Sequence, residues 1–141
     1  MPNLKQNADG SMGIQGTDLD DGPFVNVHFT YNASSVDKVD FIAPRKLIVK
    51  SIVGRCTTAG TDGSAVTAVI KKAASGTAIT SGTALHSGTF NLKGTADTNQ
   101  TLTLSTTASD LEIPAGTAIG VDFTGTLTSA AGVIMVALAP A

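Results

Sequence analysis

Apolar and polar residues alternate along much of the chain after residue 23, with the period of a β-strand. FVNVHFTY, residues 24–31, has an apolar residue at every second position from Val25, and Leu102 and Leu104 alternate with polar residues in NQTLTLSTT. Because successive side chains of a strand point to opposite faces of a sheet, this pattern predicts strands with one buried face. VDKVDFIAP, residues 36–44, repeats the pattern, and we expect its core residues to be Val36, Val39 and Phe41.

Four further segments are predicted to be strands or strand pairs. KLIVKSIVGRC, residues 46–56, is apolar on both faces and bounded by Gly54, and AVTAVIKK, residues 65–72, is rich in β-branched residues. In LEIPAGTAIGVDF, residues 111–123, the Pro-Ala-Gly sequence predicts a turn between two strands, the second with its apolar side chains on one face. VIMVAL, residues 133–138, is apolar throughout, which indicates a central strand that is buried on both faces or faces a partner.

These elements predict an all-β fold. Helical periodicity is almost absent, and glycines at every sixth position from 76 to 94 indicate hairpins with short turns around a weak strand near Phe90 and Leu92. We predict a single antiparallel β-sandwich, jelly-roll-like, with about eight or nine strands spaced roughly 8 to 12 residues apart. An immunoglobulin domain is disfavoured because the chain has one Cys and no Trp.

Residues 1–22 differ from the rest of the chain. They read MPNLKQNADGSMGIQGTDLDDG, with three glycines in seven positions and no apolar periodicity. We predict a flexible polar N-terminal arm over 1–22 and the jelly-roll-like sandwich over 23–141. The N-terminus lacks the charged-then-apolar order of a secretory signal, and no apolar run approaches the ~20 residues that span a bilayer. We therefore expect neither a signal sequence nor a membrane partner.

The charge of the chain disfavours a nucleic-acid partner. Charged residues make up 14% of the chain and the formal net charge is −2, whereas nucleic-acid-binding surfaces cluster Lys and Arg. The cationic groups, Arg45 with Lys46, then Lys50, and Lys71 with Lys72, are interpreted as solvated strand edges and strand ends. A surface so poor in charge is covered by Thr, Ser, Asn and small residues, or is partly hidden against other proteins.

Residues suited to catalysis are scarce. His28 and His86 both lack a second His at ligand spacing and are predicted to lie on the surface. Cys56 is predicted to be a small buried hydrophobe. No Gly-x-Ser-x-Gly motif is present. The chain has eleven acidic residues, so their number alone does not exclude a carboxylate pair of the kind that cleaves glycosides. However, most of the six aromatic residues lie at strand positions predicted to face the core, which disfavours a sugar-binding cleft. We predict that the protein is not an enzyme, and we assign no cofactor and no catalytic, cofactor-binding or metal-binding residue.

The acidic group in GTDLDDG is the one cluster with ligand chemistry. Asp18, Asp20 and Asp21 would offer oxygen atoms of the kind that Ca²⁺ prefers, with glycines on both sides. The segment lacks the length and the closing Glu of an EF-hand loop. A solvated loop or an ionic contact with another subunit is therefore the favoured interpretation, and calcium binding is the alternative.

Several segments resemble one family of virion proteins. The run at 47–53, the Thr/Ala/Gly-rich middle, and LEIPAGTAIGVDFTGT followed by the closing GVIMVALAP resemble the small jelly-roll head decoration (cement) proteins of tailed bacteriophages, over about residues 40–141. The resemblance implies a structural protein that is made in the host cytoplasm and stabilises a capsid from outside by bridging neighbouring shell subunits. Its implied partners are the major capsid protein and further copies of itself, with a trimer favoured. No site residue is carried over.

Three other functions compete with this prediction. A phage tail or fibre component shares the composition. A capsid protein of a small RNA virus shares the fold, but its arm would be basic, whereas residues 1–22 hold Lys5 against four aspartates. A non-catalytic carbohydrate-binding β-sandwich is the alternative from a different class. For the decoration protein, we expect the 1–22 arm to reach onto a neighbouring subunit.

Overall fold

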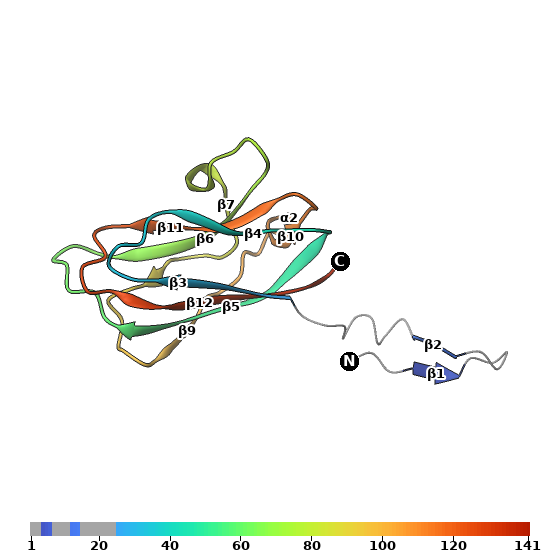
Figure 1. The fold of residues 1–141 in the computed structure, drawn as a ribbon, viewed down its shortest axis with the longest axis horizontal. Helices are drawn as coiled ribbons and strands as arrows, with labels where there is room; N and C mark the ends of the chain where they lie inside the picture. Colours follow the sequence, from blue (N-terminus) through green and yellow to red (C-terminus); the bar gives the residue numbers. More distant parts are fainter. Residues whose placement is uncertain (1–3, 7–11, 15–24) are drawn as a thin grey trace.

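The computed structural model describes residues 4–6, 12–14 and 25–141, and the side chains of 25–141. Two five-stranded antiparallel sheets pack face to face as a sandwich (Figure 1). The first sheet contains β3 (Val25–Tyr31), β5 (Leu47–Thr58), β9 (Asn99–Thr101), β10 (Glu112–Ile113) and β12 (Ala131–Pro140). The second contains β4 (Lys38–Ile42), β6 (Thr67–Ala73), β7 (Thr83–Ala84), β8 (Phe90–Asn91) and β11 (Ala118–Thr124).

The strand order is that of a jelly roll. Strands β9 and β10 pair with different parts of β5, so together they occupy one strand position beside it. In the same way, β7 and β8 pair with different parts of β6 and share one position. The sheets then read β3-β12-β5-(β9, β10) and β4-β11-β6-(β7, β8). Numbered in chain order, these eight positions run 1-8-3-6 and 2-7-4-5, which is the jelly-roll arrangement. The predicted all-β antiparallel sandwich is therefore confirmed.

The core lies between the two sheets, and period-two alternation places most of it. In β3, Val27, Phe29 and Tyr31 are buried, while Asn26 and His28 are exposed. Strands β11 and β12 are central in their sheets and carry fully buried side chains, namely Ile119, Val121, Ile134, Val136 and Leu138. The predicted inward faces of β3, apart from the exposed Val25, and of β11 are confirmed, and β12 is a central strand as predicted.

Gly54 does not end the third predicted strand. Strand β5 continues through Gly54 to Thr58 and pairs with β12 along its whole length. The ring of Phe90 from the opposite sheet lies over Gly54, where a Cβ atom would be 2.5 Å from the ring. The glycine is therefore explained by close packing inside the sandwich and not by a turn.

The predicted core positions of β4 are partly wrong. Val36 and Val39 are 72% and 45% exposed, and Phe41 alone packs against the core. The register with β11 shifts so that Ile119 pairs with Phe41 and Gly120 with Val39, which leaves Asp40 as an extra residue. Such a β-bulge interrupts the alternation of faces on which the prediction rested.

Three short elements were not predicted from the sequence. They are the 3-10 helix η1 (Ile79–Ser81), the helix α2 (Ala108–Leu111), and a hairpin in which β1 (Leu4–Gln6) pairs with β2 (Met12–Ile14). Elements of three or four residues are too short to establish a period. The other parts of the 1–22 arm, including Asp18, Asp20 and Asp21, lie outside the described residues, so calcium binding stays a hypothesis.

Candidate functional site

Two of the cationic side chains are used by the fold itself. Lys71 Nζ lies 2.6 Å from Asp122 Oδ2 and donates a hydrogen bond to the Thr80 carbonyl. Lys72 Nζ donates to the carbonyls of Ser109 and Glu112, at 2.6 and 2.7 Å. Burial lowers the pKa of Lys72, against the smaller opposing effect of nearby acidic groups. These two lysines therefore connect strands to neighbouring segments, and their ammonium groups do not form a phosphate-binding patch.

His86 is buried, which contradicts its predicted surface position. The ring is 5% exposed, its Nε2 accepts a hydrogen bond from the Ile70 N–H at 2.9 Å, and Nδ1 lies 3.1 Å from the Ser87 carbonyl oxygen. The glycine-rich sequence around it suggested an open bend, but a β-bridge to Leu104 places this segment inside the fold. Local sequence does not reveal a pairing with a residue so far along the chain.

The remaining candidates for chemistry are dispersed. Cys56 is fully buried, as predicted, and its Sγ lies 2.9 Å from the Thr58 carbonyl oxygen. His28 is exposed on the polar face of β3, also as predicted. Within residues 4–6, 12–14 and 25–141, no three His, Cys, Asp or Glu side chains are grouped so that they could hold a metal ion.

The aromatic side chains of residues 25–141 belong to the core. Tyr31, Phe29 and Phe90 are buried, and the partly buried Phe41 and Phe123 pack against the core cluster. The Tyr31 ring lies 6.4 Å from that of Phe90 and 6.1 Å from that of Phe123. Burial raises the pKa of Tyr31, whose hydroxyl is enclosed without a hydrogen-bond partner. The three buried rings are therefore unable to serve as stacking platforms for a sugar.

The candidate site is the outer face of the first sheet, where four strands align their side chains in rows. One row crosses β9, β5, β12 and β3 through Thr101, Val53, Met135 and His28. The adjacent row passes through Asn99, Arg55, Val133 and Thr30. Register alone therefore brings together Val53, Val133 and Met135 on the two central strands and places polar side chains around them, namely Arg55 on β5 itself and His28, Thr30, Asn99 and Thr101 on the flanking strands β3 and β9.

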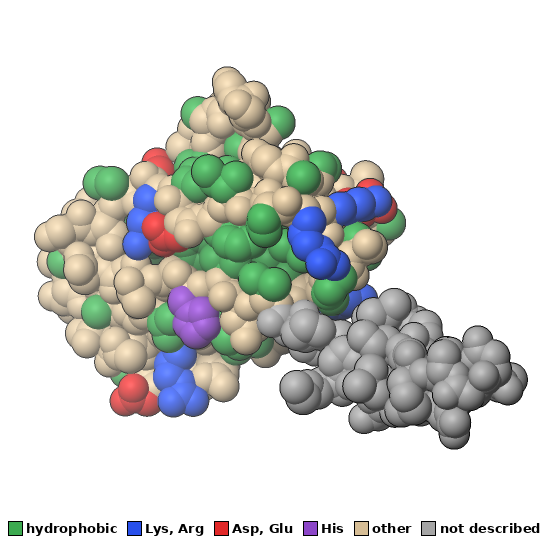
Figure 2. Space-filling view, turned by 45° about the vertical axis from the view of Figure 1, so that its right-hand side comes forward, with side chains coloured by type: hydrophobic (Ala, Val, Ile, Leu, Met, Phe, Trp, Pro, Cys, Tyr) green, Lys and Arg blue, Asp and Glu red, His purple; other side chains and the backbone are tan. Residues whose placement is uncertain are grey.

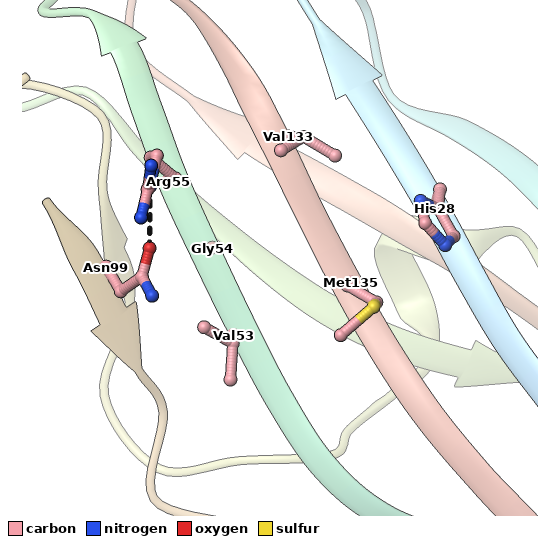
Figure 3. Close-up of a pocket in the computed structure, with 7 residues that line it drawn as sticks. All are labelled: His28, Val53, Gly54, Arg55, Asn99, Val133 and Met135. Carbon is pink, nitrogen blue, oxygen red and sulfur yellow. Dashed lines mark hydrogen bonds between the residues drawn. The ribbon is translucent and has the colours of Figure 1, made fainter. Parts of the chain in front are cut away.

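The two rows enclose a shallow depression with a volume of about 380 Å³ (Figure 3). Its apolar floor is formed by Val53, Val133 and Met135, which are partly exposed. Its polar rim includes His28, Arg55 and Asn99, and the Arg55 Nε donates a hydrogen bond to Asn99 Oδ1 at 2.7 Å. We call these six side chains the outer-sheet patch.

The patch accounts for the all-apolar sequence of β12. Ile134, Val136 and Leu138 are fully buried in the core, whereas Val133, Met135 and Ala137 on the other face are only partly buried. Of the two predictions for this strand, burial on both faces is therefore wrong. The outer-sheet patch combines apolar contact area with a few hydrogen-bonding groups, which is the composition of a binding surface.

No helix in the described parts of the chain is long and apolar enough to cross a membrane.

No protein-family model and no curated protein match the sequence. Among solved structures, the chain is similar to a chain of the "Cyanophage Pam1 capsid asymmetric unit", with a TM-score of 0.39 and 18% sequence identity, over 82% of this chain and 79% of that chain. A similarity of this size carries no conclusion about function.

Proposed function

We propose that this protein is a non-enzymatic structural component of a phage virion that binds the outside of the capsid and bridges neighbouring shell subunits. The observation that carries the proposal is the apolar floor of the outer-sheet patch, with Val53, Val133 and Met135 partly exposed on central strands. Protein interfaces have this anatomy, in which an apolar centre is surrounded by a polar rim. The jelly-roll topology also agrees with the resemblance of 40–141 to phage decoration proteins.

The chemistry of the surface favours contact with protein. Ionised groups are costly to bury in an interface, whereas hydroxyl and amide groups can be hydrogen-bonded across it. The chain has 14% charged residues, and the rim of the patch contains one Lys or Arg side chain, that of Arg55, which is already held by Asn99. A pre-positioned rim lowers the entropic cost of binding. The proposed partner is the major capsid protein.

Two alternatives remain, and one of them is weakened. A phage tail or fibre component would use the same patch, so that only its location in the particle distinguishes it. A carbohydrate-binding sandwich would need exposed aromatic rings or another sugar-binding cleft, and Tyr31 is 4% exposed. Because Tyr31, Phe29 and Phe90 are buried, these three rings do not form an exposed aromatic platform, which favours a protein partner.

The copy number in purified particles of the phage that encodes this chain tests the proposal. Quantitative mass spectrometry against the major shell protein should give one copy, or a simple fraction of one, per shell subunit. A handful of copies per particle would identify a tail or fibre component instead. Complete absence from particles would overturn the virion proposal.

The proposed role of the N-terminal arm needs its own test. Deletion of residues 1–20 should leave a folded domain, checked by circular dichroism, that binds purified particles more weakly than the full chain. Undiminished binding would show that the 1–22 arm does not contact the shell.

A further inference from the structure

One edge of the second sheet carries an unusual concentration of exposed apolar side chains. Val36, Val39 and Ile42 are 72%, 45% and 64% exposed, and they lie on β4 or just before it. Strand β4 is the last strand of its sheet and pairs on one side with β11. Figure 2 shows hydrophobic side chains gathered across the centre of one face of the molecule, with charged side chains on both sides. An exposed apolar edge strand is a template for pairing with another chain.

The charged groups of β4 do not protect this edge. Proteins commonly protect an edge strand with a lysine that projects into solvent. Here Lys38 Nζ lies 3.3 Å from Asp40 Oδ2 and donates a hydrogen bond to the Thr30 carbonyl at 2.7 Å. The two charges thereby balance each other, and both side chains remain about one-third exposed, so they are accessible to the charges of a second chain.

The other sheet edges are less suited to pairing. Strands β7, β8, β9 and β10 are two or three residues long, and such short edges offer few backbone groups. Strand β3 is longer, but its exposed side chains after Val25 are polar, namely Asn26, His28 and Thr30. Within residues 25–141, β4 is thus the edge that combines length with apolar exposure.

We propose that β4 pairs antiparallel with β4 of a second copy of this chain, about a two-fold axis that passes through Val39. This register places Val39 opposite Val39, and Lys38 of each copy opposite Asp40 of the other. A register centred on Asp40 would oppose two carboxylates, and one centred on Lys38 would oppose two ammonium groups. Opposite charges across a strand pair are stabilising and like charges are destabilising, so the charges select the Val39 register.

The resulting contact is isologous, since the same surface is used by both copies. It joins the second sheet of one copy to the second sheet of the other as one continuous sheet, and it covers the exposed valines. The inference goes beyond the proposed virion role and does not depend on it, because pairing of two chains is measured without particles. The family resemblance favours a trimer instead, and the sedimentation test below distinguishes a dimer from a trimer.

Charge reversal across the proposed axis provides the test. The full chain should sediment as a dimer in analytical ultracentrifugation, with twice the 14.2 kDa chain mass. Lys38→Asp gives a chain with acidic groups at positions 38 and 40, and Asp40→Lys gives one with basic groups at both. Each variant alone then opposes like charges, so its dimer dissociation constant should be about tenfold higher or more. An equimolar mixture of the two variants should recover the dimer, because each basic group then faces an acidic group of the other chain.

The mixing result separates the contact between copies from the Lys38–Asp40 pair within one chain, which mixing does not restore. Lys46→Glu and Glu112→Lys are the matched control, because that pair is also exposed, at 3.4 Å, and lies away from β4. The control variants should remain dimeric, singly and mixed. Val39→Lys, which opposes two ammonium groups on the axis, should be monomeric and folded. A monomeric or trimeric full chain, or failure of the mixture to recover dimers from folded variants, would overturn the proposal.

Discussion

The Nε2 atom of the buried His86 accepts a hydrogen bond from the backbone N–H of Ile70 at 2.9 Å. The Nδ1 atom lies 3.1 Å from the Ser87 carbonyl oxygen. A neutral ring with its proton on Nδ1 satisfies both contacts, whereas a proton on Nε2 would oppose the Ile70 N–H. Burial accordingly lowers the pKa of His86 below its ordinary value of 6.5.

This arrangement predicts that stability falls as the pH is lowered through the region below 6.5. There the unfolded chain binds a proton at His86 that the folded chain does not bind, so the free energy of unfolding decreases until the folded-state pKa is passed. Urea denaturation at a series of pH values between 5 and 8 should show this decrease. His86→Gln should remove it, and His28→Gln, at an exposed position, should not. An unchanged pH profile in His86→Gln would contradict the assignment.

Gly54→Ala should destabilise the fold by about 1–3 kcal/mol, as an overpacked core substitution does. The added Cβ would meet the Phe90 ring at 2.5 Å and Ile134 Cγ1 at 3.2 Å. Urea denaturation measures the loss, and Gly63→Ala is the control because nothing lies within 4 Å of its Cβ position. In a double-mutant cycle, Phe90→Leu should reduce the cost of Gly54→Ala. If the free-energy costs of Gly54→Ala and Phe90→Leu are additive, the Phe90 ring is not what opposes the added Cβ atom.

Lys71→Met should loosen the segment that carries η1. Lys71 joins Asp122 of β11 to the Thr80 carbonyl of η1, and both charged side chains are about one-fifth exposed. We expect a loss of about 1–2 kcal/mol, less than for a fully buried pair because solvent screens the charges. Amide hydrogen exchange should accelerate in 77–82. Lys46→Met, at a pair about half exposed, should leave this exchange unchanged, and equal exchange in both variants would contradict the prediction.

Met135→Lys should abolish or strongly weaken binding to capsids while the domain stays folded. Met135 lies partly exposed in the floor of the outer-sheet patch, between Val53 and His28 on the neighbouring strands, and an ammonium group there would be buried without a partner. Co-sedimentation with purified particles measures the loss. The control variant Thr77→Lys, at an exposed position in the segment that follows β6 of the second sheet, should bind normally. Normal binding by Met135→Lys would place the contact elsewhere.

The local alternation of apolar and polar residues was sufficient to predict the fold class and most of the core residues. The inward residues of β3 and β11 follow from period two, because strand geometry sends successive side chains to opposite faces wherever one face is buried. The turn before β11 was also predicted from the sequence Pro-Ala-Gly. Its Gly116 has a φ of +82°, which residues with an L side chain rarely adopt. The all-apolar sequence of β12 indicated a central strand, which it is.

Contacts between distant segments decided the rest. Gly54 lies inside β5 because Phe90 crosses over it, His86 is buried because its segment bridges to Leu104, and Val39 is exposed because a bulge interrupts an edge strand. The outer-sheet patch exists because the register aligns Val53, Met135 and His28 from three strands. The sequence alone determined which residues alternate, since that is a local property of the backbone. Only the tertiary structure decided which rows they form, because register depends on pairing between segments far apart in the chain.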